Sequence, residues 1–318
     1  AMILGYPGRT NRWMPANENE QNVKYAYPAW VEGAKTGMDN MKKFMTKDAT
    51  VNLQYASKYA STANYWKNRQ GMIDALTKAK TAQTKTKEEA KFNAWANKAE
   101  NKAKYGDVIA TINNYYAQTN LKARHDNYLT QLLRTATYGT LPASLGNGLI
   151  AYTKENEAKR AEMLPRLTSA IDGAYGSLYA PLEKEVLTAQ LNLYAAKAAE
   201  YGLAPKVAEM KAANNGDFTN DVHKAVTSSI FTSKDAVLAF LKEPKVETIT
   251  NDPLYVISND LMTKIRTKSP EQMKADDDFA IAFRKLVEGL RESKLNTIQY
   301  PDANSTLRLT YGKVRSLP

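Results

Sequence analysis

Apolar and aromatic residues recur every three or four positions through most of this chain, and few residues interrupt the pattern. The clearest stretch covers about residues 49–80. Its stripe consists of Val51, Tyr55, Tyr59, Ala63, Trp66, Gln70 and Ile73. This spacing is typical of one face of an α-helix. Only 15 of the 318 residues are glycine and 12 are proline, so long helices can run unbroken. The sequence therefore predicts an all-α, multi-helix fold.

Local signals place several further helices. Helical composition continues over residues 88–103 and 108–136, and Pro181 fits the first position of a later helix. Ser233, Asp252 and Ser269 each precede a helical pattern and are residue types that cap helix N-termini. Between these helices, residues 138–148 contain a proline and several glycines. We expect that stretch to be a loop, with helix resuming near Leu149.

Both ends of the chain differ from the helical middle. Ile3 and Leu4 form a short apolar run before a Pro7-Gly8 turn. Near the other end, Leu307, Leu309 and Tyr311 alternate with polar residues, which is typical of a half-buried strand. A two-stranded pair is marginal on its own. We therefore expect a helical domain inserted into a larger β-containing protein, with residues 3–8 and 306–314 close together in space.

Charge and composition exclude some classes of protein. The chain has 44 Lys and Arg against 33 Asp and Glu, a net charge of +11, and no cysteine. Disulfides and thiol catalysis are therefore excluded, and no apolar stretch reaches the roughly 20 residues of a membrane span. The basic tract at residues 78–87 would suit nucleic acid or an anionic surface. Because no aromatic residue interleaves it, we expect an ordinary solvent-exposed face.

The search for catalytic residues is negative. His125 and His223 are the only histidines. We expect His125 on a charged helix surface and His223 near a helix start, and neither has a partner at metal-ligand spacing. No serine lies in a nucleophile motif such as Gly-x-Ser-x-Gly. The sequence therefore predicts no catalytic residue, no metal site and no cofactor within this chain.

One helical segment combines amides and aromatic rings in an unusual way. Asn64 lies next to Tyr65, two residues before Trp66 and one turn before Asn68. A buried Asn between Tyr and Trp could hold a ligand, because its carboxamide can accept from an ammonium and donate to a carbonyl. Ordinary hydrogen bonding between packed helices is the alternative.

Four segments carry a resemblance to a known family. They are residues 5–12 (GYPGRTNR), 54–59 (QYASKY), 64–67 (NYWK) and 304–312 (NSTLRLTYG). They resemble the bacterial dipeptidyl peptidases 7 and 11, which form family forty-six of the serine peptidases. These exopeptidases remove dipeptides from the N-termini of peptides. The family joins a chymotrypsin-type double β-barrel to an inserted α-helical domain that covers the active site.

The resemblance implies a division of the chain. Residues 3–9 would be the strand and turn that leave the parent β-barrel, residues 10–304 the α-helical capping domain, and residues 305–316 the strand that returns. In the family, the catalytic His and Asp precede the helical domain and the Ser follows it. The resemblance therefore implies that the Ser-His-Asp triad lies outside this chain, and that the chain alone is inactive.

The resemblance also implies a substrate site. Asn64 is the match for the family's Asn that holds the substrate's free α-amino group, with the companion residues of that clamp on the β-barrel. Tyr65, Trp66 and Arg69 are further candidates for lining the cleft, and ordinary packing is the alternative for each. The implied partners are peptide substrates and the parent catalytic domain, with neither nucleic acid nor membrane, and a homodimeric parent is allowed. The implied location is the periplasm or the cell surface.

The residues of these motifs are more similar to those of the enzymes that prefer Asp or Glu second from the substrate's N-terminus. The alternatives are an enzyme of the dipeptidyl peptidase 7 type, which prefers apolar residues there, and a free-standing basic helical module that binds nucleic acid or anionic surfaces.

Overall fold

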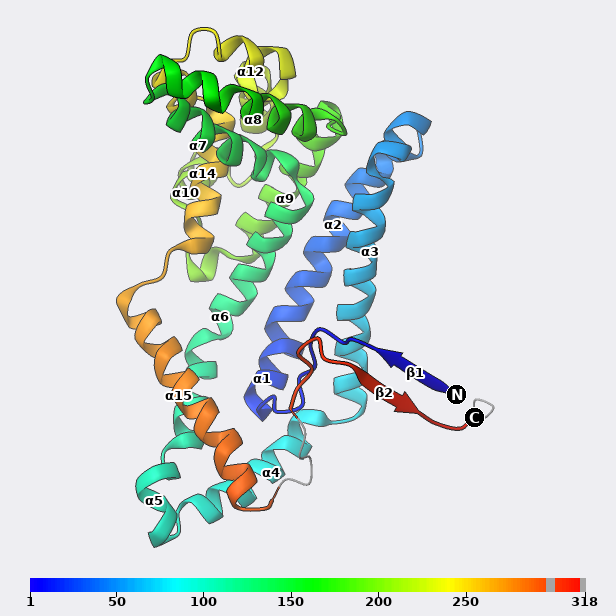
Figure 1. The fold of residues 1–318 in the computed structure, drawn as a ribbon, viewed down its shortest axis with the longest axis vertical. Coiled ribbons are helices and arrows are strands. Elements are labelled where there is room, and N and C mark those ends of the chain that lie inside the picture. The colour runs from blue at the N-terminus through cyan, green and yellow to red at the C-terminus, as the bar shows by residue number, and fades with distance from the viewer. Residues whose placement is uncertain (296–300, 315–318) are drawn as a thin grey trace. The chain divides into compact units, whose positions relative to one another are not determined.

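The computed structural model describes residues 1–295 and 301–314, and helices dominate it (Figure 1). The α-helices are α1 Ala16–Gln21, α2 Tyr27–Met45, α3 Ala49–Lys78, α4 Thr81–Ala96, α5 Ala99–Tyr105, α6 Val108–Thr135, α7 Leu141–Thr153, α8 Glu157–Tyr175, α9 Ala180–Lys197, α10 Pro205–Asn214, α11 Thr219–Ser228, α12 Lys234–Phe240, α13 Val246–Thr250, α14 Pro253–Arg266 and α15 Pro270–Glu292. A π-helical turn spans Asn22–Ala26 (η1), and 3₁₀ turns span Thr137–Gly139 (η2), Ala199–Tyr201 (η3) and Ile230–Thr232 (η4). The prediction of a mostly helical chain is confirmed. In the described part of the chain, no helix is long and apolar enough to cross a membrane.

The chain divides into two compact units. Unit 1 consists of Ala1–Glu20, Lys78–Gln118 and Pro270–Pro318, and unit 2 consists of Gln21–Thr77 and Thr119–Ser269. The domain boundaries expected at residues 9 and 305 stay a prediction. Residues 315 and 316, part of the expected returning strand, lie outside the described residues.

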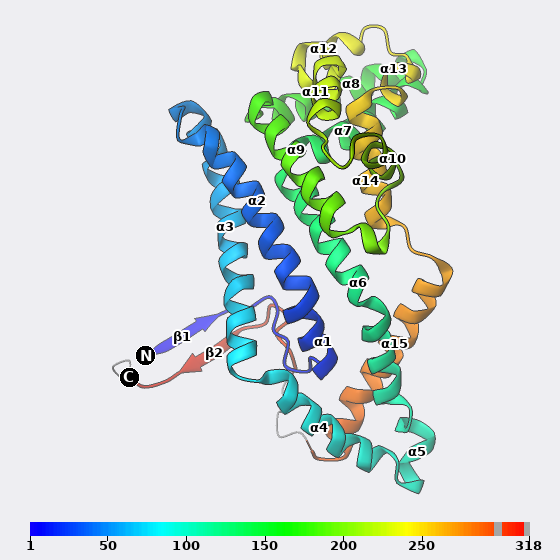
Figure 2. The ribbon, with the colours of Figure 1, turned by 180° about the vertical axis from the view of Figure 1, so that it is seen from behind.

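The two ends of the chain pair with each other in unit 1. Strands β1 Met2–Gly5 and β2 Arg308–Tyr311 are antiparallel, with Leu4 opposite Leu309, and Figure 2 shows the ribbon from behind. The prediction that the ends lie close together is confirmed. Beyond the ribbon, Asp302 ties the ends again, because its Oδ1 accepts from Thr10 Oγ1 (2.6 Å) and from the Arg12 backbone N–H (2.8 Å).

Each unit has its own apolar core. Unit 1 packs residues of α4, α5, α6 and α15 around Phe92, Tyr105, Ile112 and Leu286. Unit 2 has a large core shared by α2, α6, α9, α10, α11 and α14, and a second cluster formed mainly by α7, α8 and α12. Helices α2, α3 and α9 run lengthwise beside one another in both views (Figures 1 and 2). These helices position the candidate site described below.

Two element predictions are wrong in detail. Residues 138–148 are not a loop, because η2 is followed directly by α7 (Leu141–Thr153). Gly146 lies inside that helix for a packing reason: a Cβ there would be 2.4 Å from Cδ2 of Tyr255 on α14. The helix expected over residues 88–103 is interrupted at Asn97 and Lys98, between α4 and α5. The predicted helix cap at Asp252 is confirmed, since its side chain accepts from the backbone N–H groups of Leu254 and Tyr255.

Tyrosine hydroxyls join helices by donating to carboxylates. Examples are Tyr55–Glu183 (2.9 Å), Tyr105–Glu292 (2.8 Å), Tyr115–Asp276 (3.0 Å) and Tyr116–Glu18 (2.9 Å). In the Tyr116 pair, burial raises the pKa of the phenol and also that of the Glu18 carboxyl. Such pairs give these phenols a partner for the hydroxyl, a bond that phenylalanine cannot make; the chain has 19 tyrosines and 7 phenylalanines.

Glu183, on α9, is the most demanding of these carboxylates because its side chain is fully buried. Its Oε1 accepts from Tyr55 Oη (2.9 Å), Lys58 Nζ (3.2 Å) and Thr137 Oγ1 (2.6 Å), and its Oε2 accepts from the Thr137 backbone N–H (2.5 Å). A buried carboxylate is tolerated only when its oxygens are satisfied. Glu183 therefore fixes α3 and η2 against α9.

We expect Glu183→Gln to lower the free energy of unfolding by about 3 kcal/mol, because an amide NH₂ would then face donors in a buried site. Glu185→Gln is the matched control: Glu185 lies on the same helix, and its exposed pair with Lys43 is worth under about 1 kcal/mol. Urea denaturation of both variants measures the difference. Equal losses would contradict the role given to Glu183.

We also expect the chain to lose stability in alkali. Burial is the largest cause that raises the pKa of Tyr55, Tyr116 and Tyr194 above the usual value. These phenols stay neutral in the folded chain, whereas in the unfolded chain they ionise above about pH 10. Their contribution is therefore complete below about pH 10 and is lost as pH rises, by about 1.4 kcal/mol per pH unit for each phenol.

Unfolding free energies measured on either side of that pH check the slope. Tyr116→Phe should flatten it, and Tyr6→Phe, at an exposed position, should leave it unchanged.

Candidate functional site

The second half of α3 carries all four residues predicted for the substrate site. Asn64 is exposed, and in the described part of the chain its side chain makes no hydrogen bond. Helix α3 reaches the core only near its start, where Val51 and Tyr55 are buried, so Asn64 lies beyond the buried part of the helix. Neither sequence-based alternative for Asn64, burial or helix-packing hydrogen bonds, is observed. Its carboxamide is accessible to a ligand.

Two of the four residues belong to a stack of rings and guanidinium groups. The Arg69 guanidinium carbon lies 4.6 Å from the ring centroid of Tyr27 and 5.5 Å from that of Trp30. The Arg134 guanidinium carbon lies 5.5 Å from Trp30 and 5.1 Å from Tyr65. We call these five residues the arginine–aromatic stack. It joins α2, α3 and α6.

Cation–π contacts hold the stack together. Each such contact is worth about 0.5–1 kcal/mol at an exposed site. Among the described residues neither Arg69 nor Arg134 has an ion-pair partner, so both guanidinium groups rely on their cation–π contacts with the rings. The stack joins Tyr65, the residue directly after Asn64, to Arg134 of α6 and through it to Trp30 of α2.

Trp66 takes a different role from its neighbours. It is half-buried, and its indole Nε1 is buried without a hydrogen-bond partner among the described residues. The contacts that join Tyr65 and Arg69 to other helices do not include it. The structure thus brings Tyr65 and Arg69 together with Trp30, and leaves Trp66 outside the stack.

Sequence reasoning missed Tyr27, Trp30 and Arg134. They lie on α2 and α6, about 35 and 70 residues from Asn64 along the chain. Rarity was the only available signal, since Trp30 is one of four tryptophans. Nothing in the local pattern of either helix pairs these residues with α3.

The motif at residues 54–59 anchors the first half of α3. Tyr55 and Lys58 both donate to Glu183, Lys58 Nζ also donates to Thr137 Oγ1 (2.8 Å), and Tyr55 Oη accepts from the Tyr179 backbone N–H (3.0 Å). The anchor ends about two helical turns before Asn64. This motif therefore fixes the helix that carries the candidate site but does not form part of the site.

His125 is buried, so the expectation of a surface position is wrong. Its Nδ1 lies 2.8 Å from Asp126 Oδ1 and its Nε2 lies 2.8 Å from Tyr194 Oη, with 1% of the residue exposed. Burial and hydrogen bonds from His125 and Lys122 have opposite effects on Asp126, and the net result is a lowered pKa. The charged residues next to His125 in the sequence do not show that its own ring packs against Tyr194. His223 is exposed, as expected, with Nδ1 2.9 Å from Lys184 Nζ.

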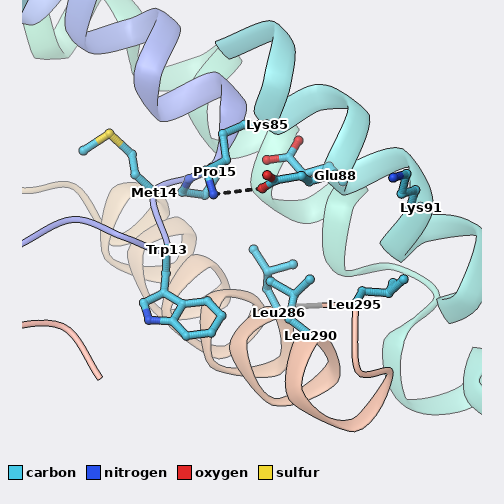
Figure 3. A pocket seen from close by; sticks show the side chains of 10 residues that line it. Trp13, Met14, Pro15, Lys85, Glu88, Lys91, Leu286, Leu290 and Leu295 are labelled. Carbon is cyan, nitrogen blue, oxygen red and sulfur yellow. Dashed lines mark hydrogen bonds and ion pairs between the residues drawn. The ribbon is translucent and has the colours of Figure 1, made fainter. Parts of the chain in front are cut away.

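Unit 1 contains a hollow between residues of α4 and the end of α15 (Figure 3). Its volume is about 290 Å³, and its wall combines Trp13 and the leucines of the α15 end with the charged side chains of α4. Glu89 there accepts from the Ala16 backbone N–H (2.6 Å), and burial raises the pKa of its carboxyl. The hollow contains neither histidine nor serine and none of the predicted site residues. Among the described residues no cluster suited to a metal ion is present.

Comparison with known proteins gives a consistent result. A family model described as peptidase S46 matches residues 1–317. A protein named dipeptidyl-peptidase 7 from Capnocytophaga gingivalis is 44% identical, and the match covers 100% of this chain and 44% of that protein. An Asp/Glu-specific dipeptidyl-peptidase from Flavobacterium psychrophilum is 26% identical over 99% of this chain and 44% of its own length. The chain spans less than half the length of these curated relatives.

A solved structure shows the same fold. The crystal structure of Porphyromonas endodontalis DPP11 in complex with the dipeptide Arg-Glu superposes with a TM-score of 0.82. The match covers 98% of this chain and 44% of that one, at 24% sequence identity. At this identity the likeness extends to the fold alone.

Proposed function

This chain belongs to the peptidase S46 family, and from that membership we propose that it is the α-helical domain of a longer dipeptidyl peptidase. The parent enzyme releases dipeptides from the N-termini of peptides. In this proposal the helical domain covers the active site and helps to bind the substrate N-terminus, while a Ser-His-Asp triad elsewhere in the parent performs the hydrolysis. We place the parent in the periplasm or at the cell surface, as the family resemblance implies.

The β1–β2 ribbon is the observation that supports an inserted domain. Ile3 (73% exposed) and Leu4 (64%) point to opposite faces of β1, and both faces are open to solvent. Tyr311 on β2 is 81% exposed. A two-stranded ribbon with apolar side chains on both faces is marginal alone. It suits strands that continue into a larger sheet, such as the expected parent β-barrel.

Asn64 is the group that we assign to the substrate's α-amino end. Its exposed carboxamide can accept a hydrogen bond from the ammonium through oxygen and donate one to a peptide carbonyl through nitrogen. Tyr65 and Arg69, which belong to the stack, and Trp66 are the residues that we propose to line the cleft. A fixed distance from Asn64 to the nucleophile would set the cleavage position two residues from the N-terminus.

The proposed mechanism divides the work between domains. In the parent, Ser attacks the scissile carbonyl, His transfers the proton, and backbone N–H groups stabilise the oxyanion. The helical domain contributes no reacting atom. It holds the peptide by its amine and excludes water when it closes, and both effects lower the barrier by positioning.

The preference for the second residue has two candidates. The residues of the sequence motifs suggest a preference for Asp or Glu at that position. The net charge of +11 would also steer acidic peptides toward the site. The 44% identity to a dipeptidyl-peptidase 7, against 26% to an Asp/Glu-specific relative, favours the apolar alternative. The ratio of kcat/KM for dipeptidyl substrates ending in Glu and in Leu distinguishes them.

We expect the 318-residue chain by itself to release no dipeptide, because we propose that the Ser-His-Asp triad lies elsewhere in the parent enzyme. The measurement is hydrolysis of dipeptidyl amide substrates by purified chain, with the full-length enzyme as the positive control. Release that co-purifies with the chain and persists after repeated chromatography would refute the division of work between domains.

In the full-length enzyme, we expect Asn64→Ala to lower kcat/KM by about 10- to 1000-fold, because a charge-assisted hydrogen bond to the ammonium is lost. Asn68→Ala is the matched control, since Asn68 is exposed one turn later on α3. Neither change should move the free energy of unfolding by more than about 0.5 kcal/mol. An unchanged kcat/KM for Asn64→Ala would assign the amine to other residues.

A further inference from the structure

We propose that Arg134 is a positioning residue for the substrate site, acting through Asn64. By stacking on Trp30 of α2 and Tyr65 of α3, its guanidinium fixes the turn of α3 that presents the Asn64 carboxamide. The inference rests on the proposed function, because it assumes that Asn64 binds the substrate's amine.

The contacts of α3 show why its second half needs such a support. The first half is held by Val51 and Tyr55 in the core and by the hydrogen bonds of Tyr55 and Lys58 to Glu183. From residue 59 to residue 77, the described chain has no hydrogen bond or ion pair between α3 and another helix. The polar contacts there stay within α3: Thr62 donates to the Lys58 carbonyl, and Gln70 donates to Asp74.

Cation–π contacts provide the specific links in that half. Arg134 lies 5.1 Å from the ring centroid of Tyr65, the residue directly after Asn64, and 5.5 Å from that of Trp30. Arg69 reaches back from α3 to Trp30 and Tyr27. The indole of Trp30 thus receives one guanidinium from α3 and one from α6. Arg134 is the member of the stack that ties α6 to both rings.

Arginine suits this role for a chemical reason. Its guanidinium is planar and weakly hydrated, so it stacks on aromatic faces, and it stays charged at every physiological pH. A lysine ammonium is a compact and strongly hydrated charge on a flexible stem. Arg134→Lys therefore keeps the charge near Asn64 while it weakens the stacking. This separates positioning from simple electrostatics.

The first test measures order in α3 directly. Hydrogen exchange of residues 61–68 in the full-length enzyme should be about fivefold faster or more in Arg134→Lys, because the contacts that oppose local opening are weakened. Arg166→Lys, at an exposed position of α8, is the control and should change nothing. Unchanged exchange in Arg134→Lys would overturn the proposal.

The second test is a double-mutant cycle on kcat/KM in the same enzyme. Arg134→Lys alone should lower kcat/KM by about 3- to 30-fold, mainly through KM, and should have no further effect in the Asn64→Ala background. The same loss in both backgrounds would mean that Arg134 does not act through Asn64, and would overturn the proposal.

The two hypotheses fail in different ways. If Asn64→Ala leaves kcat/KM unchanged, the proposed role of Asn64 fails, and the positioning role of Arg134 fails with it. If Asn64→Ala lowers kcat/KM but Arg134→Lys changes neither exchange nor kcat/KM, only the present proposal fails. Faster exchange together with a loss that vanishes in the Asn64→Ala background supports both.

Discussion

The requirement to satisfy one buried carboxylate organises the part of the molecule that carries the candidate site. Glu183 has no exposed side-chain surface, yet it must find hydrogen-bond donors for both oxygens. The donors come from α3 and from the turn η2, so these segments cannot move independently of α9. The direction of α3 beyond Lys58, and hence the place of Asn64, depends on this arrangement.

Helix α3 is held by two different kinds of interaction along its length. Its first half uses apolar burial and hydrogen bonds to Glu183, which are strong and directional. Its second half uses the arginine–aromatic stack, in which each contact is weaker and more adaptable. The role proposed for Asn64 fits this arrangement, because Asn64 lies on a supported helix and remains accessible.

The same chemistry of tyrosine recurs in both units. Tyr105, Tyr115 and Tyr116 in unit 1 donate to carboxylates on other helices, as Tyr55 does in unit 2. Helices that present few apolar side chains can thus be joined at defined points, because a phenol adds one directional bond to a large buried ring.

Strand-like patterns at both ends predicted that the ends lie close together, as they do. The sequence by itself also determined the helical character, the approximate spans of α3 and α6, and the cap at Asp252. These follow from periodicity, turn chemistry and local hydrogen bonding, which act within a few residues. Its motifs also led to the family, and to Asn64 as the candidate residue. Tertiary structure alone decided that Asn64 is exposed, that His125 is buried against Tyr194, and that Gly146 continues a helix beneath Tyr255. It also brought Trp30 and Arg134 to Tyr65. The reason is physical: which face of a helix is buried depends on the neighbour that packs there, and that neighbour can come from any distance along the chain.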